Sequence, residues 1–425
     1  MLEIHRALRA RGAAVRVATH GGTYEQALRD AAVPYDLIGP RVGDERCAAF
    51  VRSVPGIGPP DQSMWSDAEI RAYVDAEIAY FDEHGVRAVV TGWTLTALLS
   101  TRLAGIPLVT EHAGAFLPPM FERGLLPAPT SRVGLPLERW LPKPVRRRLF
   151  NAGAARLTIH TAGFNRVAGE LGVPGIPSFP ALLLGDLTLV TDIPELLGIP
   201  RDELEAWTPP DPRRYRPGTR LRYAGPIHAR LARPVPERVE RFLAGPRPIV
   251  YVAITSSPAA LVREVVHALQ ALDVRVLVAA TVHDLRELEN ERVLVRGVLP
   301  SHEIMPRVDV AVTAGGQGSV QAALAAGVPL IGIPLQPEQD ANVALAERQG
   351  AARLVPQSAA GTATLTRTAR EMLAADHYRQ SARRLQALFA RVDGPAAAAE
   401  AILELADGER APAGRPSTAR LERRP

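Results

Sequence analysis

Cysteine and lysine are almost absent from this chain of 425 residues. Cys47 is the only cysteine, which excludes an internal disulfide framework and a cysteine-rich metal site. Lys143 is the only lysine, so nearly all of the positive charge comes from arginine. The arginines are spread along the chain and the formal net charge is only +5, so we expect no nucleic-acid partner.

Long apolar runs are missing as well. No stretch reaches the ~18–20 residues of a membrane-spanning helix, and no signal peptide is visible. Histidines at the spacing of a helical metal site are also missing, so we expect no bound metal. Hydrophobic residues nevertheless make up 47% of the chain, which is enough for the cores of two domains. This composition is typical of a two-domain cytoplasmic enzyme.

The most informative segment of the chain is 309–342. An apolar strand pattern that ends at Val312 is followed by a glycine-rich turn and then by an alanine-rich helix pattern over 319–326. A turn that runs into a helix start directs free N–H groups and the positive end of the helix dipole at one point, which suits a phosphate. The glycines that permit such a turn are Gly315, Gly316 and Gly318.

Polar side chains follow a second strand pattern at 329–333. Glu338, Gln339 and Asn342 can hydrogen-bond several hydroxyl groups. The segment therefore offers a diphosphate cradle beside a polar edge that can read a polyol. These are the two halves of a nucleotide sugar.

This segment resembles the donor-binding signature of family 1 glycosyltransferases, the UDP-glycosyltransferase and macrolide-glycosyltransferase group. The family pattern is roughly His-Gly-Gly-x-Gly-Ser/Thr, then Gly-Val-Pro, then Asp/Glu-Gln-x-x-Asn. The chain matches it in order and spacing at 314–319, 327–329 and 338–342. The resemblance extends more weakly over residues 1–405, and it implies the GT-B fold, in which two Rossmann-like domains face a cleft.

Two positions depart from the family pattern. Ala314 stands where the family usually has a histidine that contacts the diphosphate, and Ala322 stands where many members have a ribose-binding glutamate. Each missing hydrogen bond would cost roughly 1–3 kcal/mol, so the cradle must rely on backbone N–H groups and on Ser319. The resemblance places the donor site at Ser256, Val298, Leu299, Gly315, Gly316, Gln317, Gly318, Ser319, Glu338 and Gln339. For Ser256, the alternative interpretation is a helix N-cap. Val298 would contact the nucleotide base without stacking on it.

Alternating strand and helix patterns predict an α/β fold with parallel sheets. The strand patterns lie at 14–18, 85–91, 106–110, 182–190, 248–255, 274–279, 293–295, 310–312 and 329–333. We expect an acceptor-binding N-terminal Rossmann-like domain at 1–230, a nucleotide-sugar-binding C-terminal domain at 246–405 and a disordered tail at 406–425.

The chain begins with a helix pattern at Leu2, whereas a Rossmann-like domain begins with a strand and a ligand-facing turn. In the resembled family that turn carries the histidine that deprotonates the acceptor hydroxyl. We expect an incomplete start that lacks the first strand, and a protein that has lost this base is the alternative. His112, next to Glu111 after a strand pattern, is a candidate substitute base, although a structural pair is the safer interpretation. His20 also follows a strand pattern and is interpreted as part of a plain turn.

The regular spacing of apolar residues that marks strands and helices weakens over 114–150, where proline, phenylalanine and tryptophan interrupt it. Such residues suit an apolar pocket built from loops, and a loop packed on its own domain is the alternative. Because the resembled family binds acceptors in this region, we expect an acceptor pocket at Trp93, His112, Phe116 and Phe121.

The densest basic run lies at 143–148. It predicts a solvated helix face, with contact to anionic lipid or to an acidic acceptor as the alternative. Weak peripheral membrane contact would then use Lys143, Arg146, Arg147 and Arg148.

We therefore predict an inverting glycosyltransferase that moves a hexosyl group from a UDP- or dTDP-sugar to a hydroxyl group. The acceptor would be small and partly apolar, such as a natural product or a lipid. The first alternative is a non-catalytic nucleotide-sugar-binding or auxiliary protein, suggested by the missing base and by Ala314 and Ala322. The second is a UDP-sugar 2-epimerase, which the arrangement of Glu338 and Gln339 disfavours. Beyond the donor and the acceptor we expect no cofactor.

Overall fold

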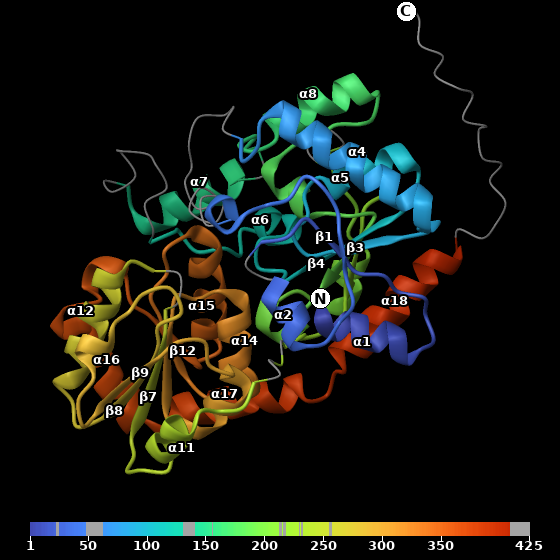
Figure 1. Ribbon diagram of the computed structural model, residues 1–425. Helices are drawn as coiled ribbons and strands as arrows, with labels where there is room; N and C mark the ends of the chain where they lie inside the picture. The colour runs from blue at the N-terminus through green and yellow to red at the C-terminus, as the bar shows by residue number, and fades with distance from the viewer. Residues whose placement is uncertain are drawn as a thin grey trace, which may run out of the picture.

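The structure is a computed structural model that describes residues 1–22, 25–47, 63–130, 141–154, 156–211, 215, 218–228, 230, 233–254 and 257–408 (Figure 1). Within these residues the chain forms two α/β halves, each built on a parallel sheet. The prediction of an α/β fold with two parallel-sheet domains is confirmed.

The N-terminal half is built on a four-stranded sheet in the order β3-β4-β5-β6. The strands are β3 (Val89–Thr91), β4 (Leu108–His112), β5 (Leu187–Val190) and β6 (Arg220–Tyr223). A separate parallel pair consists of β1 (Ala18–Thr19) and β2 (Asp36–Leu37). Of the strand predicted at 14–18, only Ala18 lies in a strand, because β1 begins there and ends at Thr19. The strand predicted at 85–91 begins at Val89, because Gly85 has φ 58° and ends the preceding helix.

The N-terminal half also contains helical elements, several of which pack on this sheet. They are α1 (Leu2–Ala10), α2 (Glu25–Asp30), α4 (Asp67–His84), α5 (Ala97–Ala104), α6 (Pro118–Glu122), α7 (Lys143–Ala154), α8 (Ala162–Leu171), η2 (Phe179–Leu183), α9 (Pro194–Leu197) and α10 (Arg201–Glu205). The longest, α4, starts at a capping box in which Ser66 and Glu69 exchange side-chain and backbone hydrogen bonds.

Alternate residues of β4 face two different hydrophobic clusters. Leu108 packs with apolar residues of α4, α5 and α8 on one face of the sheet. Val109 packs on the other face with Ile4 of α1 and Ile402 of α18 (Gly394–Gly408). This alternation follows from the two-residue period of a strand.

The last helix, α18, returns to the N-terminal half. It lies along α1 and closes the second face of the N-terminal sheet (Figure 1). The predicted boundary of the C-terminal domain at 246–405 is therefore wrong at its end, because this apolar helix finds its partner face on the other sheet. The helix also continues to Gly408, so the predicted disordered tail at 406–425 starts too early.

Two segments connect the halves, and they touch. A Cβ on Gly225 would lie 2.3 Å from Cγ1 of Val392, and a Cβ on Gly394 would lie 2.2 Å from the carbonyl oxygen of Pro226. Neither position leaves room for a side chain. The outgoing and returning segments therefore pass side by side.

The C-terminal half is built on a six-stranded parallel sheet in the order β12-β11-β10-β7-β8-β9. The strands are β7 (Ile249–Ala253), β8 (Arg275–Ala279), β9 (Val293–Arg296), β10 (Val310–Thr313), β11 (Leu330–Gly332) and β12 (Ala352–Leu354). The helical elements are α11 (Glu237–Leu243), α12 (Ala259–Gln270), η3 (Arg286–Leu288), α13 (Ser301–Ile304), η4 (Met305–Arg307), α14 (Gln317–Ala325), α15 (Pro337–Arg348), η5 (Gln357–Ala359), α16 (Ala363–Ala374) and α17 (Asp376–Phe389).

Helices cover both faces of this sheet. Val250 and Val252 of β7 pack against α12 and α16, whereas Tyr251 between them belongs to the cluster that contains residues of α14, α15 and α17. Both faces of the central strands are buried, as the continuous apolar patterns predict.

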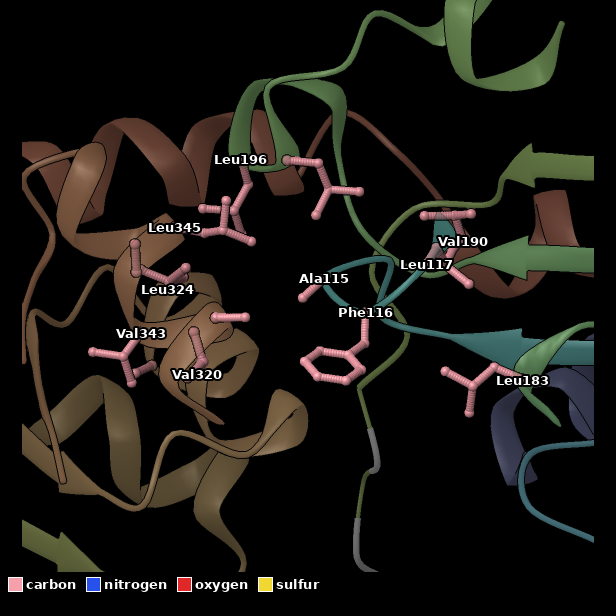
Figure 2. Packing of buried hydrophobic residues seen from close by; sticks show 14 of the residues in the cluster. Ala115, Phe116, Leu117, Leu183, Val190, Leu196, Val320, Leu324, Val343 and Leu345 are labelled. Atoms are coloured by element: carbon pink, nitrogen blue, oxygen red, sulfur yellow. The ribbon is translucent and has the colours of Figure 1, made fainter. Parts of the chain in front are cut away.

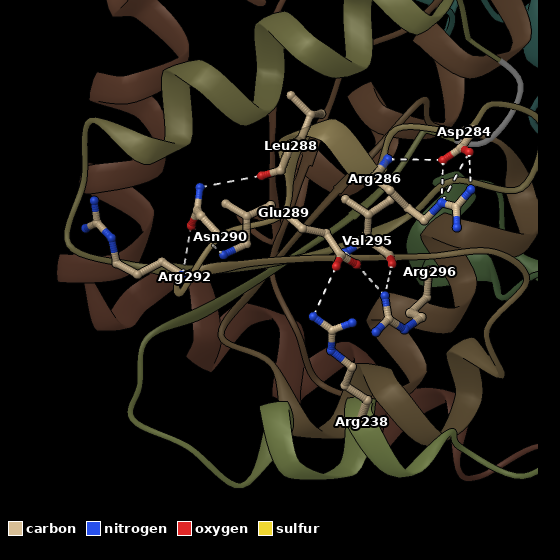
Figure 3. A network of polar contacts seen from close by, with 10 residues as sticks. Arg238, Asp284, Arg286, Leu288, Glu289, Asn290, Arg292, Val295 and Arg296 are labelled. Atoms are coloured by element: carbon tan, nitrogen blue, oxygen red, sulfur yellow. Dashed lines mark hydrogen bonds and ion pairs between the residues drawn. The ribbon is translucent and has the colours of Figure 1, made fainter.

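The outer edge of the C-terminal sheet is held by Glu289 (Figure 3). Its carboxylate accepts hydrogen bonds from the Val295 N–H (3.2 Å) and from Arg296, and it pairs with Arg238 of α11 at 3.1 Å. These contacts tie β9 to α11, the first helix after the connection from the N-terminal half.

A single hydrophobic cluster runs from one half into the other. Figure 2 shows Ala115 and Phe116 of the N-terminal half on the side of Val320 and Leu324 of α14, with Leu117 beside Val190. The two halves therefore meet through packed side chains at the start of α14.

We expect Ile402→Ala on α18 to destabilise the protein by about 2–4 kcal/mol, because it would leave a cavity under α1 in the N-terminal half. The measurement is denaturant unfolding followed by far-UV circular dichroism. Glu404→Ala is the matched control on the same helix. It removes a solvent-exposed ion pair with Arg222 and should cost less than about 1 kcal/mol. Equal effects of the two changes would contradict the packing of α18 on the N-terminal sheet.

Candidate functional site

A sharp turn follows β10 at Gly315. This residue has φ 87°, and a Cβ there would lie 2.6 Å from Cγ2 of Val343 and 2.9 Å from the carbonyl oxygen of Gln339. Only glycine fits both the conformation and the space. Gly316 is the N-cap of α14 with φ −61° and has no atom within 4 Å of a would-be Cβ. The predicted turn is confirmed, with Gly315 as the glycine that it requires.

The start of α14 is open. The helix begins at Gln317, two residues before the predicted start at Ser319, and no side chain caps it. Among the described residues, the N–H groups of Gln317 and Gly318 have no acceptor, whereas the Ser319 N–H donates to the Gly316 carbonyl oxygen at 3.0 Å. Together with the helix dipole, the two free N–H groups form a site suited to an anion, and Ser319 lies half-buried in that turn.

The polar residues predicted after the second strand lie on the first turns of α15. Asn342 donates from Nδ2 to the carbonyl oxygen of Gly315 (3.0 Å) and to Oε1 of Glu338 (2.6 Å). Oε1 of Gln339 accepts from the Leu335 N–H at 2.8 Å. The structure thus joins the glycine turn and the Glu338–Gln339 pair into one unit through Asn342.

Burial raises the pKa of Glu338 to about 7, and the hydrogen bond from Asn342 opposes this shift. A comparable group lies across the interface in the N-terminal half. Burial raises the pKa of Asp192 to about 7, against hydrogen bonds from the Ile193 N–H and from Gln321. Near neutral pH both carboxyl groups are therefore only partly ionised.

Polar contacts connect α14 to the residue after β5. Nε2 of Gln317 donates to Oγ1 of Thr191 at 2.7 Å, and Nε2 of Gln321 donates to the Thr191 carbonyl oxygen at 2.5 Å. The start of α14 therefore faces the carboxyl ends of the N-terminal strands. Gln317, which we expected to bind the donor, directs its amide to the N-terminal half.

A second contact joins α15 to the N-terminal half. Oδ1 of Asp340 accepts from the N–H (3.0 Å) and from Oγ1 (2.5 Å) of Thr130. Asp340 is buried, so its side chain connects the halves and does not face a ligand. Each of the two helices that carry the predicted donor residues is thus hydrogen-bonded to a threonine of the N-terminal half, α14 to Thr191 and α15 to Thr130.

The predicted acceptor residues lie in different environments. Trp93 follows β3 and is 38% exposed. Phe116 and Phe121 are buried and pack edge to face, with ring centroids 4.9 Å apart. Both phenylalanines belong to the hydrophobic cluster that runs from the N-terminal half into the C-terminal half. A pocket that combines all four residues stays a prediction.

His112 ends β4, and its geometry does not favour the role of a base. Its Nδ1 accepts a hydrogen bond from the Gly114 N–H at 3.1 Å. The neutral ring therefore carries its proton on Nε2 and has no free lone pair. Burial lowers the pKa of His112 to about 4, which further weakens the ring as a base.

His20, which follows β1, is hydrogen-bonded to the buried carboxylate of Glu77. Nε2 of His20 lies 3.2 Å from Oε1 of Glu77, and Glu77 also accepts from Thr96 and Ser100. Nδ1 of His20 is buried without a partner. The motif is more than the plain turn we expected, but its free nitrogen is closed off from solvent.

The remaining predicted residues lie around the C-terminal sheet and on α7. Val298 is 49% exposed and its neighbour Leu299 is buried, whereas Ser256 lies outside the described residues. On α7, Arg147 donates to the Gly124 carbonyl oxygen at 2.6 Å and thus serves the fold. The alternative of membrane contact through Lys143, Arg146, Arg147 and Arg148 gains no support.

Sequence reasoning missed Thr191, Asp192 and Thr130. Thr191 and Asp192 follow β5 directly, so the rule that ligands bind beyond the carboxyl ends of parallel strands would have found them. No local pattern marks Thr130, because its partner lies 210 residues away in the chain.

The described residues contain no group of three or more His, Cys, Asp or Glu side chains able to hold a metal ion. Among the described helices, none is both long and apolar enough to cross a bilayer.

Known proteins resemble the chain in sequence. Residues 209–396 match the family described as UDP-glucoronosyl and UDP-glucosyl transferase. A PGL/p-HBAD biosynthesis glycosyltransferase of Mycobacterium tuberculosis is 29% identical over 335 residues, which is 77% of this chain and 72% of that protein. A PGL/p-HBAD biosynthesis rhamnosyltransferase of Mycobacterium bovis is also 29% identical, over 76% of this chain and 68% of that protein.

Solved structures share the fold. The glycotransferase of kitacinnamycin superposes with a TM-score of 0.64 at 20% identity, covering 95% of this chain and 94% of that one. The glycosyltransferase VinC, in complex with dTDP, gives a TM-score of 0.62 at 16% identity and covers 96% of each chain. At these identities the likeness establishes the GT-B fold.

We expect Gly315→Ala to destabilise the protein by about 2 kcal/mol or more. The added Cβ would meet Val343 and the backbone of Gln339, in a conformation that costs a non-glycine residue about 1–2 kcal/mol. Thermal and denaturant unfolding measure the loss. The control is Gly316→Ala, where space is open and only the N-cap preference is lost, at about 1 kcal/mol or less. A larger loss at Gly316 would contradict the geometry of the turn.

The raised pKa of Glu338 predicts a pH-dependent stability. The folded state binds this proton more tightly than the unfolded state, whose carboxyl pKa is near 4.5. The contribution is therefore fully present below about pH 4.5 and is lost as the pH rises through about 7. Glu338→Gln removes this dependence. The free energy of unfolding of the variant, relative to that of the wild type, should therefore increase by about 1–2 kcal/mol from pH 5 to pH 8. Unfolding curves across this range test it, with the exposed Glu170→Gln as control. Parallel curves for wild type and Glu338→Gln would refute the shift.

Proposed function

Since this chain is a family 1 glycosyltransferase with the GT-B fold, we propose that it transfers a hexosyl group from a nucleoside diphosphate sugar to a hydroxyl group. The acceptor is small and partly apolar, such as a natural product or a lipid. One observation carries the proposal: the uncapped start of α14 lies beside Glu338 and Gln339 and faces the strand ends of the N-terminal half.

The diphosphate of the donor would lie at the glycine turn. The open N–H groups of α14 and the half-buried Ser319 would neutralise its charge there, without the side chains that Ala314 and Ala322 replace. The sugar would lie toward α15, where Gln339 keeps its Nε2 amide for donation because only Oε1 is engaged by Leu335. Val298 is exposed at the end of the loop after β9 and could contact the base.

The reaction would proceed by a single displacement with inversion. The acceptor hydroxyl gives its proton to a general base as its oxygen attacks the anomeric carbon from the N-terminal side, while the bond to the diphosphate breaks on the C-terminal side. The diphosphate leaves with the electron pair, and the helix N–H groups stabilise its added charge. This division of roles needs no metal ion, which is part of the proposal.

Known proteins guide the choice of substrates. One relative is described as a rhamnosyltransferase, and two structural neighbours are described as complexes with thymidine diphosphate. We therefore choose dTDP-rhamnose and UDP-glucose as the first donors. The acceptor panel combines substituted phenols with long-chain alcohols, since the relatives include enzymes named for lipid and natural-product biosynthesis.

The test is transfer by the purified protein, followed by mass spectrometry, with the anomeric configuration of the product read from NMR coupling constants. We expect turnover with at least one donor, an inverted product and no loss of activity in EDTA. A retained configuration would refute the single displacement. Binding of dTDP or UDP without transfer to any member of the panel would instead favour the non-catalytic alternative.

Gln339→Ala should separate sugar recognition from diphosphate binding. We expect the Kd for the nucleotide sugar to rise about tenfold, the equivalent of one lost hydrogen bond of about 1.4 kcal/mol, with little change for the free nucleoside diphosphate. Calorimetry with both ligands measures this. Gln270→Ala, at the end of α12 on the opposite face of the sheet, is the control. Equal losses for both ligands would contradict the assignment of Gln339 to the sugar.

A further inference from the structure

Three residues at one edge of the N-terminal sheet lie together. Gly92 follows β3, Glu111 lies near the end of β4, and Thr191 follows β5. Because these three strands are parallel neighbours, their carboxyl ends lie at the same edge. That edge is the one that the start of α14 faces, through the contact between Gln317 and Thr191.

A hydrogen-bonded relay runs from α14 to Glu111. The Gln317 amide donates to Oγ1 of Thr191 (2.7 Å), and this hydroxyl donates to Oε1 of Glu111 at 3.1 Å. Thr191 is fully buried, so water does not compete for its hydroxyl. The amide fixes the direction of the hydroxyl proton, and the hydroxyl fixes the orientation of the carboxylate.

The second carboxylate oxygen of Glu111, Oε2, takes no part in this relay. Within the described part of the chain, Oε2 has no hydrogen-bond partner, and the residue is only partly buried. Oε2 lies 3.5 Å from the point where a Cβ on Gly92 would be. A Cβ at position 92 would make van der Waals contact with this oxygen, and Cγ of Met1 lies 3.8 Å from the same point. Oε2 is not among the buried unpaired atoms of the described residues, so it keeps some contact with solvent.

The other titratable groups that follow strands of the N-terminal half are engaged or enclosed. His112 has its lone pair occupied by the Gly114 N–H. The free nitrogen of His20 is buried, and the Asp192 carboxyl is buried against Ile193. Glu111 alone among these four groups combines an accessible acceptor atom with a fixed orientation.

We propose that Glu111 is the general base of the reaction and that Thr191 is its positioning residue. This assignment rests on the proposed function. Oε2 of Glu111 takes the proton of the acceptor hydroxyl as the oxygen bonds to the anomeric carbon and the diphosphate leaves with the electrons of the broken bond. Because Thr191 is itself held by Gln317, the base is oriented only while the donor-binding helix is docked.

The first test is Glu111→Gln, which keeps the shape and the acceptor for Thr191 but removes the basic oxygen. We expect kcat to fall about 100-fold or more, with the Kd for the nucleoside diphosphate and the melting temperature unchanged. Glu195→Gln, an exposed carboxylate close behind Thr191 in the chain, should leave kcat within about twofold. Retention of a third or more of wild-type kcat by Glu111→Gln would overturn the assignment.

Acceptor acidity separates a base from a structural residue. An acidic hydroxyl needs less help to lose its proton, so the loss in kcat should be at least tenfold smaller for 4-nitrophenol than for 4-methoxyphenol. An equal loss for the two phenols would refute proton transfer to Glu111. If the wild type transfers to no member of the acceptor panel, the proposed function fails and this assignment fails with it. An active wild type with an equally active Glu111→Gln overturns only the assignment.

The relay is tested at Thr191. Thr191→Val removes the hydroxyl at nearly constant volume and should lower kcat about tenfold, whereas Thr191→Ser keeps the hydroxyl and should restore most of it. In the background of Glu111→Gln, the Thr191→Val change should add little, because both act through one proton acceptor. Fully additive losses, or a Thr191→Ser variant as impaired as Thr191→Val, would show that Thr191 does not position Glu111.

Discussion

The docking of the α14 start against the end of β5 is the contact on which the rest of the site depends. Two glutamine amides, from Gln317 and Gln321, engage a single buried residue, Thr191. Apolar packing around Val320 and Leu324 of α14 excludes water from this junction (Figure 2). The contact brings the start of α14, where we propose that the diphosphate binds, up to the carboxyl ends of the N-terminal strands.

The electrostatic environment of this junction favours the binding of an anion. The first turn of α14 contributes the positive end of a helix dipole, and the nearby carboxyl groups of Glu338 and Asp192 are largely buried. Since burial raises the pKa of both groups to about 7, they repel a diphosphate less than ionised carboxylates would. In the proposed donor site, this reduced repulsion would favour the diphosphate at the start of α14, where Ala314 and Ala322 offer no polar side chain.

Sequence patterns predicted the parts of the structure that depend on neighbouring residues. The strand–turn–helix order around Gly315 and the parallel sheets follow from local periodicity and glycine placement. The patterns did not predict that α18 would pack on the N-terminal sheet, because an apolar helix face does not reveal its partner. They also missed the relay through Thr191 and the contact of Thr130 with Asp340, since these depend on side chains brought together by the whole fold. His112 was a reasonable candidate from its place after a strand, and only the hydrogen bond from Gly114 showed its lone pair to be occupied.

The close passage of the two connecting segments, Gly225–Pro226 and Val392–Gly394, sets the mechanics of the molecule. Two separate tethers would allow the halves to twist and slide, but two tethers in contact act as one joint. Any opening of the interface between the halves would therefore turn about this joint, where the two segments are in contact. Substrates would enter on the side opposite the joint, and each closing stroke would return α14 to the same place on Thr191.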